Sequence, residues 1–334
     1  MTTKKRVYNK IYDKEEYEKV NAENKYIIED FLEEYQQRKI KATTLQQYAN
    51  NLRIFAIFVY RTCDNKSFFD LNKRDFRKLS IWLSDTLQLS NARTNSILSA
   101  CRSMLTYCED SDEWSYDNNV AKKVKGLPKE RVRNDDDDFF MSFDQIMTVK
   151  DRLLEMGELQ LAVLHMVLFD SGARRNEIFQ IKKDGLLDGN KTNIVTGKRG
   201  KQFSLVYLDD TKELIRQHLA ERGKDDIESL WIIGKGDHKR EASYENIYEF
   251  VMKIRKVLCD IEQKELNIFP HSYRHSRCEC LLQGTDNRIL DANGEPKKFS
   301  LEEVQVFLHH SNPSTTLGYA KDHSEDLIDA MFDF

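Results

Sequence analysis

The sequence predicts a mainly α-helical protein of two domains, and three observations support this. The chain has 334 residues, which is more than one ordinary domain. It contains only four prolines and 13 glycines, so few residues interrupt long helices. Apolar residues recur at helical spacing on both sides of a polar segment, residues 115–138. That segment is predicted to be the linker between the two domains.

Four amphipathic helices are expected within residues 21–114. They cover residues 22–39, 43–62, 73–87 and 91–109. Each places apolar side chains three or four positions apart, so that one face can be buried. Four such helices joined by short turns form a compact bundle. Residues 1–20 are expected to be an N-terminal extension.

Residues 139–334 are predicted to form a second, mostly helical domain with a small β-hairpin. Helices are expected at residues 143–155, 158–170, 211–222, 244–262, 271–282 and 301–309. Two short β-like runs on either side of Gly197 predict the hairpin. The tail, residues 324–334, is predicted to be a short amphipathic helix.

Composition excludes several classes of protein. The net charge is −4 and the pI about 6.1, which argues against a protein that merely coats nucleic acid. No apolar run reaches the length of about 20 residues that a membrane helix needs, and the N-terminus lacks the apolar core of a secretory signal. The six cysteines include no C-x-x-C pair, so free thiols in the cytoplasm are expected rather than a zinc site.

The predicted linker is rich in charge. Its basic residues are Lys122, Lys123, Lys125, Lys129, Arg131 and Arg133. An acidic run, residues 135–138, follows them. Such a segment is either a solvated tether or a contact to a phosphate backbone, and composition leaves both interpretations open.

Four segments of the second domain offer side chains suited to a phosphate. Their candidate residues are Arg174; Lys198, Arg199 and Lys201; His271 and Arg274; His310 and Tyr319. A tyrosine can attack a phosphodiester, arginines can neutralise its oxygens, and lysine or histidine can transfer the protons. No Walker motif, serine triad or metal-ligand cluster is present, so neither a cofactor nor a metal is expected.

These segments resemble, in order and in wording, the motifs of the tyrosine recombinases, which include phage integrases and the Xer and Cre-like enzymes. The family's Gly-x-Arg-x-x-Glu is matched by GARRNE at residues 172–177, which selects Arg174. The hairpin GKRGKQF is similar to the motif that carries the family's lysine, here Lys201. The family's His-x-x-Arg box is matched by HSYR at residues 271–274. The sequence LHHSNPSTTLGY at residues 308–319 resembles the family's final motif, which ends in the tyrosine. The resemblance thus implies these catalytic residues: Arg174, Lys201, His271, Arg274, His310 and Tyr319.

The resemblance implies a site-specific recombinase of a phage or other mobile element, acting on double-stranded DNA through a 3′-phosphotyrosine intermediate. Residues 21–114 then correspond to the SAM-like core-binding domain, and residues 139–334 to the catalytic domain. Dimers on one DNA site and tetramers in synapsis are expected, in the bacterial cytoplasm and associated with the nucleoid. The tail, residues 324–334, packs on a neighbouring protomer or folds back on its own domain.

Two residues and the length of one interval depart from the family pattern. His309 stands where a glycine is usual, and Phe203 stands where an arginine often follows the hairpin lysine. The interval before His310 is long, and residues 284–299 are predicted to be an exposed loop that holds the insertion. These departures favour a second hypothesis, a DNA-binding regulator such as a phage repressor. The complete set of catalytic residues favours the recombinase.

Overall fold

The computed structural model describes residues 7–128 and 140–309. The chain divides into two compact units, residues 1–132 and 133–334, and each is described by itself. Both are built mainly from helices, with short strands in the second unit, so the predicted fold class is confirmed. Within the described ranges, no helix combines the length and the apolar character needed to cross a membrane.

The first unit contains the four predicted helices. They are α3 (Ala22–Gln37), α4 (Ala42–Thr62), α5 (Lys73–Ile81) and α6 (Asn91–Asp110). Helix α4 contacts both α3 and α6, and residues 54–59 along it are all buried. The unbroken apolar sequence IFAIFV suits this central place, because a helix covered on several sides has no face for polar residues.

Two short helices precede this bundle. Helices α1 (Val7–Ile11) and α2 (Lys14–Glu18) both pack on α4, and Ile11 is buried in the core of the first unit. The described part of the predicted extension therefore belongs to the first unit. Helices of five residues are too short to show a periodic pattern, and α1 and α2 were therefore not predicted.

Residues 115–128, expected to be part of the linker, also pack on the first unit. They include a 3₁₀ turn, η3 (Val120–Lys123), which contacts α6. Ala121 and Val124 are buried, and the Arg102 guanidinium donates hydrogen bonds to their carbonyl oxygens, at 3.3 and 3.2 Å. The polar composition of residues 115–128 suggested a linker. A few apolar contacts and one arginine are nevertheless enough to hold this segment against the first unit.

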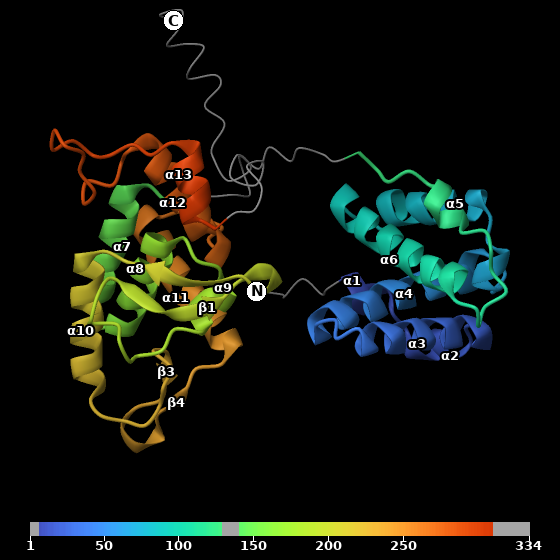
Figure 1. Ribbon diagram of the computed structural model, residues 1–334, viewed down its shortest axis with the longest axis horizontal. Coiled ribbons are helices and arrows are strands. Elements are labelled where there is room, and N and C mark those ends of the chain that lie inside the picture. The colour runs from blue at the N-terminus through green and yellow to red at the C-terminus, as the bar shows by residue number, and fades with distance from the viewer. Residues whose placement is uncertain (1–6, 129–139, 310–334) are drawn as a thin grey trace, which may run out of the picture. The chain divides into compact units, whose positions relative to one another are not determined.

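Helix α8 (Leu159–Ser171) lies at the centre of the second unit (Figure 1). It contacts α7 (Phe143–Glu155), α10 (Asp209–Arg222), α11 (Tyr244–Glu262) and α12 (Pro270–Gln283). Residues 161–171 are buried without exception. The sequence LQLAVLHMVLF is apolar on all sides, as a helix enclosed by four others requires.

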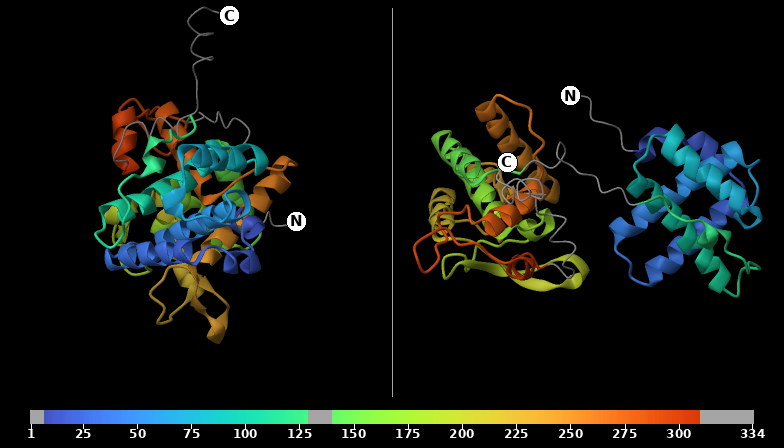
Figure 2. Two further views of the ribbon diagram at one scale, coloured as in Figure 1. Left: turned by 90° about the vertical axis from the view of Figure 1, so that its right-hand side faces the viewer. Right: turned by 90° about the horizontal axis from the view of Figure 1, so that it is seen from above.

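The predicted hairpin is present at the surface of the second unit (Figure 1, Figure 2). Strands β1 (Lys191–Thr196) and β2 (Gln202–Val206) pair antiparallel through a 3₁₀ turn, η4 (Lys198–Gly200). The Gly197 amide donates to the Lys201 carbonyl oxygen at 2.8 Å and closes the hairpin.

A second two-stranded sheet was not predicted. It consists of β3 (Ile232–Ile233) and β4 (Arg240–Glu241). Two residues per strand are too few for a pattern of alternation. The remaining described elements of the second unit are α9 (Arg175–Phe179), η5 (Gly236–His238) and α13 (Leu301–Phe307). The first unit also contains a 3₁₀ turn, η1 (Phe68–Asp70), and a π-helical turn, η2 (Trp82–Thr86), that continues α5. The predicted tail helix, residues 324–334, lies outside the described residues.

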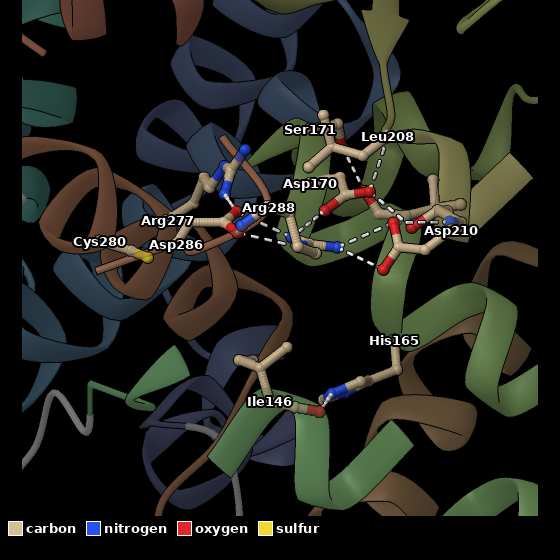
Figure 3. A network of polar contacts seen from close by, with 12 residues as sticks. Ile146, His165, Asp170, Ser171, Leu208, Asp210, Arg277, Cys280, Asp286 and Arg288 are labelled. Atoms are coloured by element: carbon tan, nitrogen blue, oxygen red, sulfur yellow. Dashed lines mark hydrogen bonds and ion pairs between the residues drawn. The ribbon is translucent and has the colours of Figure 1, made fainter. Parts of the chain in front are cut away.

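A fully buried histidine, His165 on α8, contacts both α7 and α12. Figure 3 shows its contact with Ile146 of α7. The His165 Nε2 lies 2.9 Å from the Ile146 carbonyl oxygen, and its Nδ1 lies 2.7 Å from the Tyr273 hydroxyl. Because a carbonyl oxygen can only accept, Nε2 carries the proton and Nδ1 accepts from the tyrosine. Burial lowers the pKa of His165 to about 4, so the ring is neutral.

This neutral histidine predicts a loss of stability in acid. The pKa of His165 is about 6.5 when unfolded and about 4 when folded. Its contribution is therefore complete above the unfolded value and is lost as pH falls toward the folded value, by about 3 kcal/mol. We expect His165→Gln to be less stable than wild type at neutral pH and to lose less stability on acidification. Urea unfolding at a series of pH values measures this, and parallel curves would contradict it.

Candidate active site

The first predicted catalytic residue follows a tight turn at the end of α8. Gly172 adopts the left-handed conformation with φ 55°, and a Cβ there would lie 2.6 Å from Leu308 Cδ2. The turn thus needs glycine for both its backbone and its lack of a side chain. Arg174 comes two residues later and is the N-cap of α9.

A buried carboxylate fixes the orientation of Arg174. Glu177 Oε1 accepts from Arg174 Nη1 at 2.9 Å, and Oε2 accepts from the Arg174 backbone N–H at 2.8 Å. The Glu177 side chain is 2% exposed and that of Arg174 is 28% exposed. The guanidinium is therefore held in place but remains accessible to a ligand.

The neighbouring arginine points elsewhere. The Arg175 guanidinium carbon lies 3.8 Å from the centre of the Tyr244 ring and 5.6 Å from that of Tyr248, both on α11. This cation–π stacking holds Arg175 against another helix. The two adjacent arginines therefore have different partners, Glu177 for Arg174 and the rings of α11 for Arg175.

Arg274 of α12 connects two separate parts of the chain. Its Nη1 donates to the Gly172 carbonyl oxygen at 2.7 Å, and its Nη2 donates to the Leu308 carbonyl oxygen. The residue is 2% exposed. One guanidinium therefore holds the turn before Arg174 against the end of α13.

His271 is an exposed residue in the otherwise buried first turn of the same helix, after Pro270. Its ring packs edge-on against His275, with the ring centres 5.1 Å apart. The predicted helix start at the His-x-x-Arg box is confirmed, and it brings His271 one turn before Arg274.

The hairpin supplies the other cations. Lys198, Arg199 and Lys201 are all exposed around the turn between β1 and β2. Phe203, on β2, is half-buried, and a Cβ at Gly197 would lie 2.7 Å from its Cε1 and 3.1 Å from Glu177 Oε1. The hairpin turn therefore packs directly against the group that orients Arg174.

The charges around His309 show which predicted residues come together. Burial lowers the pKa of His309, Lys201 lowers it further, and Arg274 and Arg174 act in the same direction, while Glu177 opposes them. Arg174, Lys201 and Arg274 are thus gathered around His309, together with Glu177, and we call this cluster of residues the active-site pocket. His310 and Tyr319 lie outside the described residues, and their roles stay predictions.

A network of largely buried charges lies at the end of α8, where Asp170 pairs with Arg288 (Figure 3). Arg288 Nη2 donates to Asp170 Oδ1 at 2.7 Å and to Asp286 Oδ2 at 2.9 Å, and Nη1 donates to Asp210 Oδ2 at 2.9 Å. Arg277 Nη1 also donates to Asp286 Oδ2, at 2.6 Å. Burial favours the neutral form of Asp286, but the two arginines overcome this effect and lower its pKa.

The prediction of an exposed loop at residues 284–299 holds for most of its positions. Two residues of the loop are exceptions, because Asp286 is 3% exposed and the Arg288 side chain 13% exposed. Asp170 lies two residues before Gly172, so this loop helps to fix the end of α8. No local pattern reveals the Arg288–Asp170 pair, because its members are 118 residues apart.

The basic residues of the predicted linker are only partly described. Lys122 pairs with Glu109, Lys123 donates to Asn118 Oδ1 at 2.7 Å, and Lys125 is exposed. The other three, Lys129, Arg131 and Arg133, lie outside the described residues. Contacts of these side chains to DNA therefore stay a prediction.

Fold and pocket together define a class of protein. A helical domain gathers two arginines and a lysine around one hairpin, and one arginine is both oriented and accessible. Such a set stabilises the charge that develops on a phosphodiester during transfer. The class is that of proteins that act on phosphodiesters without a nucleotide-binding loop.

Comparison with known proteins gives the family. The sequence model of the phage integrase family matches residues 140–326, more than half of the chain. The chain therefore belongs to the phage integrase family, the tyrosine recombinases. The predictions of this family and of a DNA-recombining enzyme are confirmed at this level.

Two curated relatives align along most of the chain. The SPbeta prophage-derived recombinase-like protein YomM of Bacillus subtilis is 26% identical, over 90% of this chain and 88% of its own. The tyrosine recombinase XerD of Listeria monocytogenes is 23% identical, over 88% of this chain and 93% of its own.

Solved structures share the fold. XerH bound to its palindromic difH substrate matches with a TM-score of 0.66 at 17% identity, covering 87% of this chain and 81% of XerH. A lambda integrase dimer bound to a COC′ core site matches with a TM-score of 0.62 at 13% identity, covering 87% of this chain and 96% of that one.

The charge network predicts a strong effect of Arg288. Replacing it by methionine keeps an apolar stem but leaves Asp170 buried without its cation. We expect Arg288→Met to lower the free energy of unfolding of the second unit by about 3–5 kcal/mol. The matched control is Asp210→Asn, because the Asp210 side chain is 36% exposed. It should cost less than about 1 kcal/mol.

Unfolding of the second unit can be followed through its own tryptophan. Trp231 is fully buried there, whereas Trp82 and Trp114 belong to the first unit and can be replaced by phenylalanine in all samples. Urea unfolding monitored by Trp231 fluorescence then measures the effect. Equal losses in Arg288→Met and Asp210→Asn would contradict a central role of the Arg288–Asp170 pair.

Proposed function

We propose that this protein is an active site-specific recombinase that cleaves and rejoins double-stranded DNA through Tyr319. The observation that carries the proposal is the Arg174–Glu177 ion pair, which holds an accessible guanidinium beside Lys201 and Arg274. A protein that only binds DNA does not need a buried carboxylate to orient one exposed arginine. The comparisons offer no support for the alternative of a repressor.

The proposed reaction is a transfer of a phosphodiester to tyrosine. The Tyr319 oxygen bonds to phosphorus as the bond from phosphorus to the 5′-oxygen breaks, which leaves a 3′-phosphotyrosine. Arg174 and Arg274 stabilise the charge on the two non-bridging oxygens. Lys201 protonates the leaving 5′-oxygen, and a histidine, His271 or His310, takes the tyrosine proton. Rejoining is the reverse, so the energy of the bond is kept.

The proposed assembly follows the related structures. A lambda integrase structure of this fold is a tetramer bound to a Holliday junction, and another is a dimer bound to a core site. We infer dimers on one DNA site and tetramers in synapsis for this chain, with the tail at residues 324–334 packing on a neighbour. Lys198 and Arg199 of the hairpin, with the basic residues from 122 to 133, contact the DNA backbone. The place of action is the bacterial cytoplasm, at the nucleoid of a phage-bearing or otherwise mobile-element-bearing host.

The covalent intermediate tests this proposal. A binding site is first selected from random duplexes and then synthesised with a nick beside the cleavage position. Wild type should form an SDS-resistant adduct with this duplex, and Tyr319→Phe should form none. Specific binding by wild type without any adduct would show that the recombinase proposal is wrong.

Two adjacent arginines provide a matched pair of variants. We expect Arg174→Ala to keep DNA binding within a few-fold but to form the adduct about a hundredfold more slowly or worse, because one oriented cation of the pocket is lost. Arg175→Ala should retain most of the rate, since Arg175 stacks on Tyr244. Rate constants for adduct formation measure this, and equal losses in both variants would contradict the assignment.

A further inference from the structure

The two departures from the family pattern are in contact with each other. His309 stands where a glycine is usual and Phe203 where an arginine is usual, and their ring centres lie only 3.8 Å apart, with planes inclined by 32°. The rings therefore lie in close contact with their planes tilted, and this contact orients the imidazole. Neither residue is explained by the roles assigned to the six predicted catalytic residues.

The backbone of His309 adopts a conformation that favours glycine over a residue with a side chain. His309 has φ 54°, in the left-handed region, and its N–H donates to the Val306 carbonyl oxygen at 3.0 Å as α13 ends. Glycine adopts this conformation at a lower energy than histidine does. The turn alone would thus be better served by glycine, and the imidazole needs another explanation.

The imidazole lies among the charged groups of the active-site pocket. The groups that act on it come from three elements: Arg174 and Glu177 at the start of α9, Lys201 on the hairpin, and Arg274 on α12. The Arg274 guanidinium also binds the carbonyl oxygen of the preceding residue, Leu308. Phe203 of the hairpin thus contacts the His309 ring, and Arg274 holds the backbone just before it.

We propose that His309 is an additional phosphate-binding residue of the active-site pocket, which takes up a proton when a DNA phosphate enters. The proposal deepens the proposed function, on which it rests for the identity of the ligand. The Phe203 ring is the positioning residue that keeps the imidazole facing the cations. A neutral ring at this place admits the phosphate without adding to the repulsion among three cations, and the charged ring then donates a hydrogen bond to it.

The sign of the pH dependence follows from the charges. Without phosphate, burial and then Lys201 lower the pKa of His309, so the ring is neutral near pH 7. A phosphodiester brings one negative charge, which favours the protonated ring and raises its pKa. Phosphate affinity is then greatest below the lower, free-state pKa and is lost as pH rises through the bound-state pKa. Each unit of difference between the two pKa values corresponds to about a tenfold change in affinity.

The test follows His309 directly by NMR of the full chain with ¹³C-labelled histidine rings. The His309 signal is assigned as the one that disappears in His309→Asn. Its pKa is measured in three samples: protein alone, protein with inorganic phosphate, and protein with a short DNA duplex at low salt. We expect a pKa below 6.5 for the protein alone and a rise of about one unit or more with either ligand. A rise with the duplex but not with free phosphate also supports the proposal and places the ligand in the DNA backbone.

Three variants separate the ring from its support. His309→Gly restores a residue suited to the turn, and it should bind duplex about tenfold more weakly than wild type at pH below the free-state pKa, with the difference vanishing at high pH. Phe203→Leu leaves every charge in place and should reduce the pKa rise of His309. His238→Asn, at an exposed position on η5, is the control and should keep the pH dependence of wild type.

The outcomes distinguish this inference from the proposed function. An identical pKa of His309 with and without both ligands would overturn the inference, even if wild type forms the covalent adduct through Tyr319. A pKa rise in a protein that forms no adduct would support the inference and count against the recombinase proposal. A pH dependence of affinity that persists unchanged in His309→Gly would also overturn the inference.

Discussion

The structure of the active-site pocket depends on the guanidinium of Arg274. It donates to the carbonyl oxygen of Gly172, in the turn before Arg174, and to that of Leu308, just before His309. These two segments are far apart in the chain, and each presents a residue of the pocket. A buried cation with only apolar surroundings would be unstable, and backbone carbonyl oxygens supply the partners that it needs without cancelling its charge. Arg274 therefore shapes the pocket and at the same time keeps it positive.

A second arginine, Arg288, fixes the end of α8 just before the Gly172 turn. Arg288 pairs with Asp170, two residues before Gly172, and with Asp286 and Asp210, while its guanidinium also lies over the Phe169 and Phe143 rings. Here carboxylates neutralise the cation, in contrast to the pocket, where Glu177 faces Arg174, Lys201 and Arg274 together. This division leaves an excess of positive charge in the active-site pocket, around His309. The rigid end of α8 joins the two regions.

Sequence predicted the parts of this arrangement that depend on neighbouring residues. The turn at Gly172 and the hairpin that carries Lys201 follow from short motifs, and the structure contains both. The choice of Arg174 over Arg175 as the catalytic arginine stays a prediction. Sequence did not predict the Arg288–Asp170 pair or the contact of His309 with Phe203, because these partners are distant in the chain and no periodic pattern connects them. The packing of residues 115–128 on the first unit was missed for a related reason, since a polar composition says little about which backbone carbonyls an arginine such as Arg102 will bind.

Arg274 holds the two segments of the pocket together. Hydrogen exchange of backbone amides measures this role most directly. Arg274→Lys keeps the charge but cannot donate to two carbonyl oxygens in the fixed fork of a guanidinium. Exchange of backbone amides should become faster in this variant both at residues 172–178 and at residues 304–309, and stay unchanged in the first unit. Arg255→Lys, at a partly exposed position on α11 (side chain 21% exposed), is the matched control and should leave both segments as in wild type. Unchanged exchange in both segments of Arg274→Lys would contradict the claim and leave Arg274 with a role in catalysis alone.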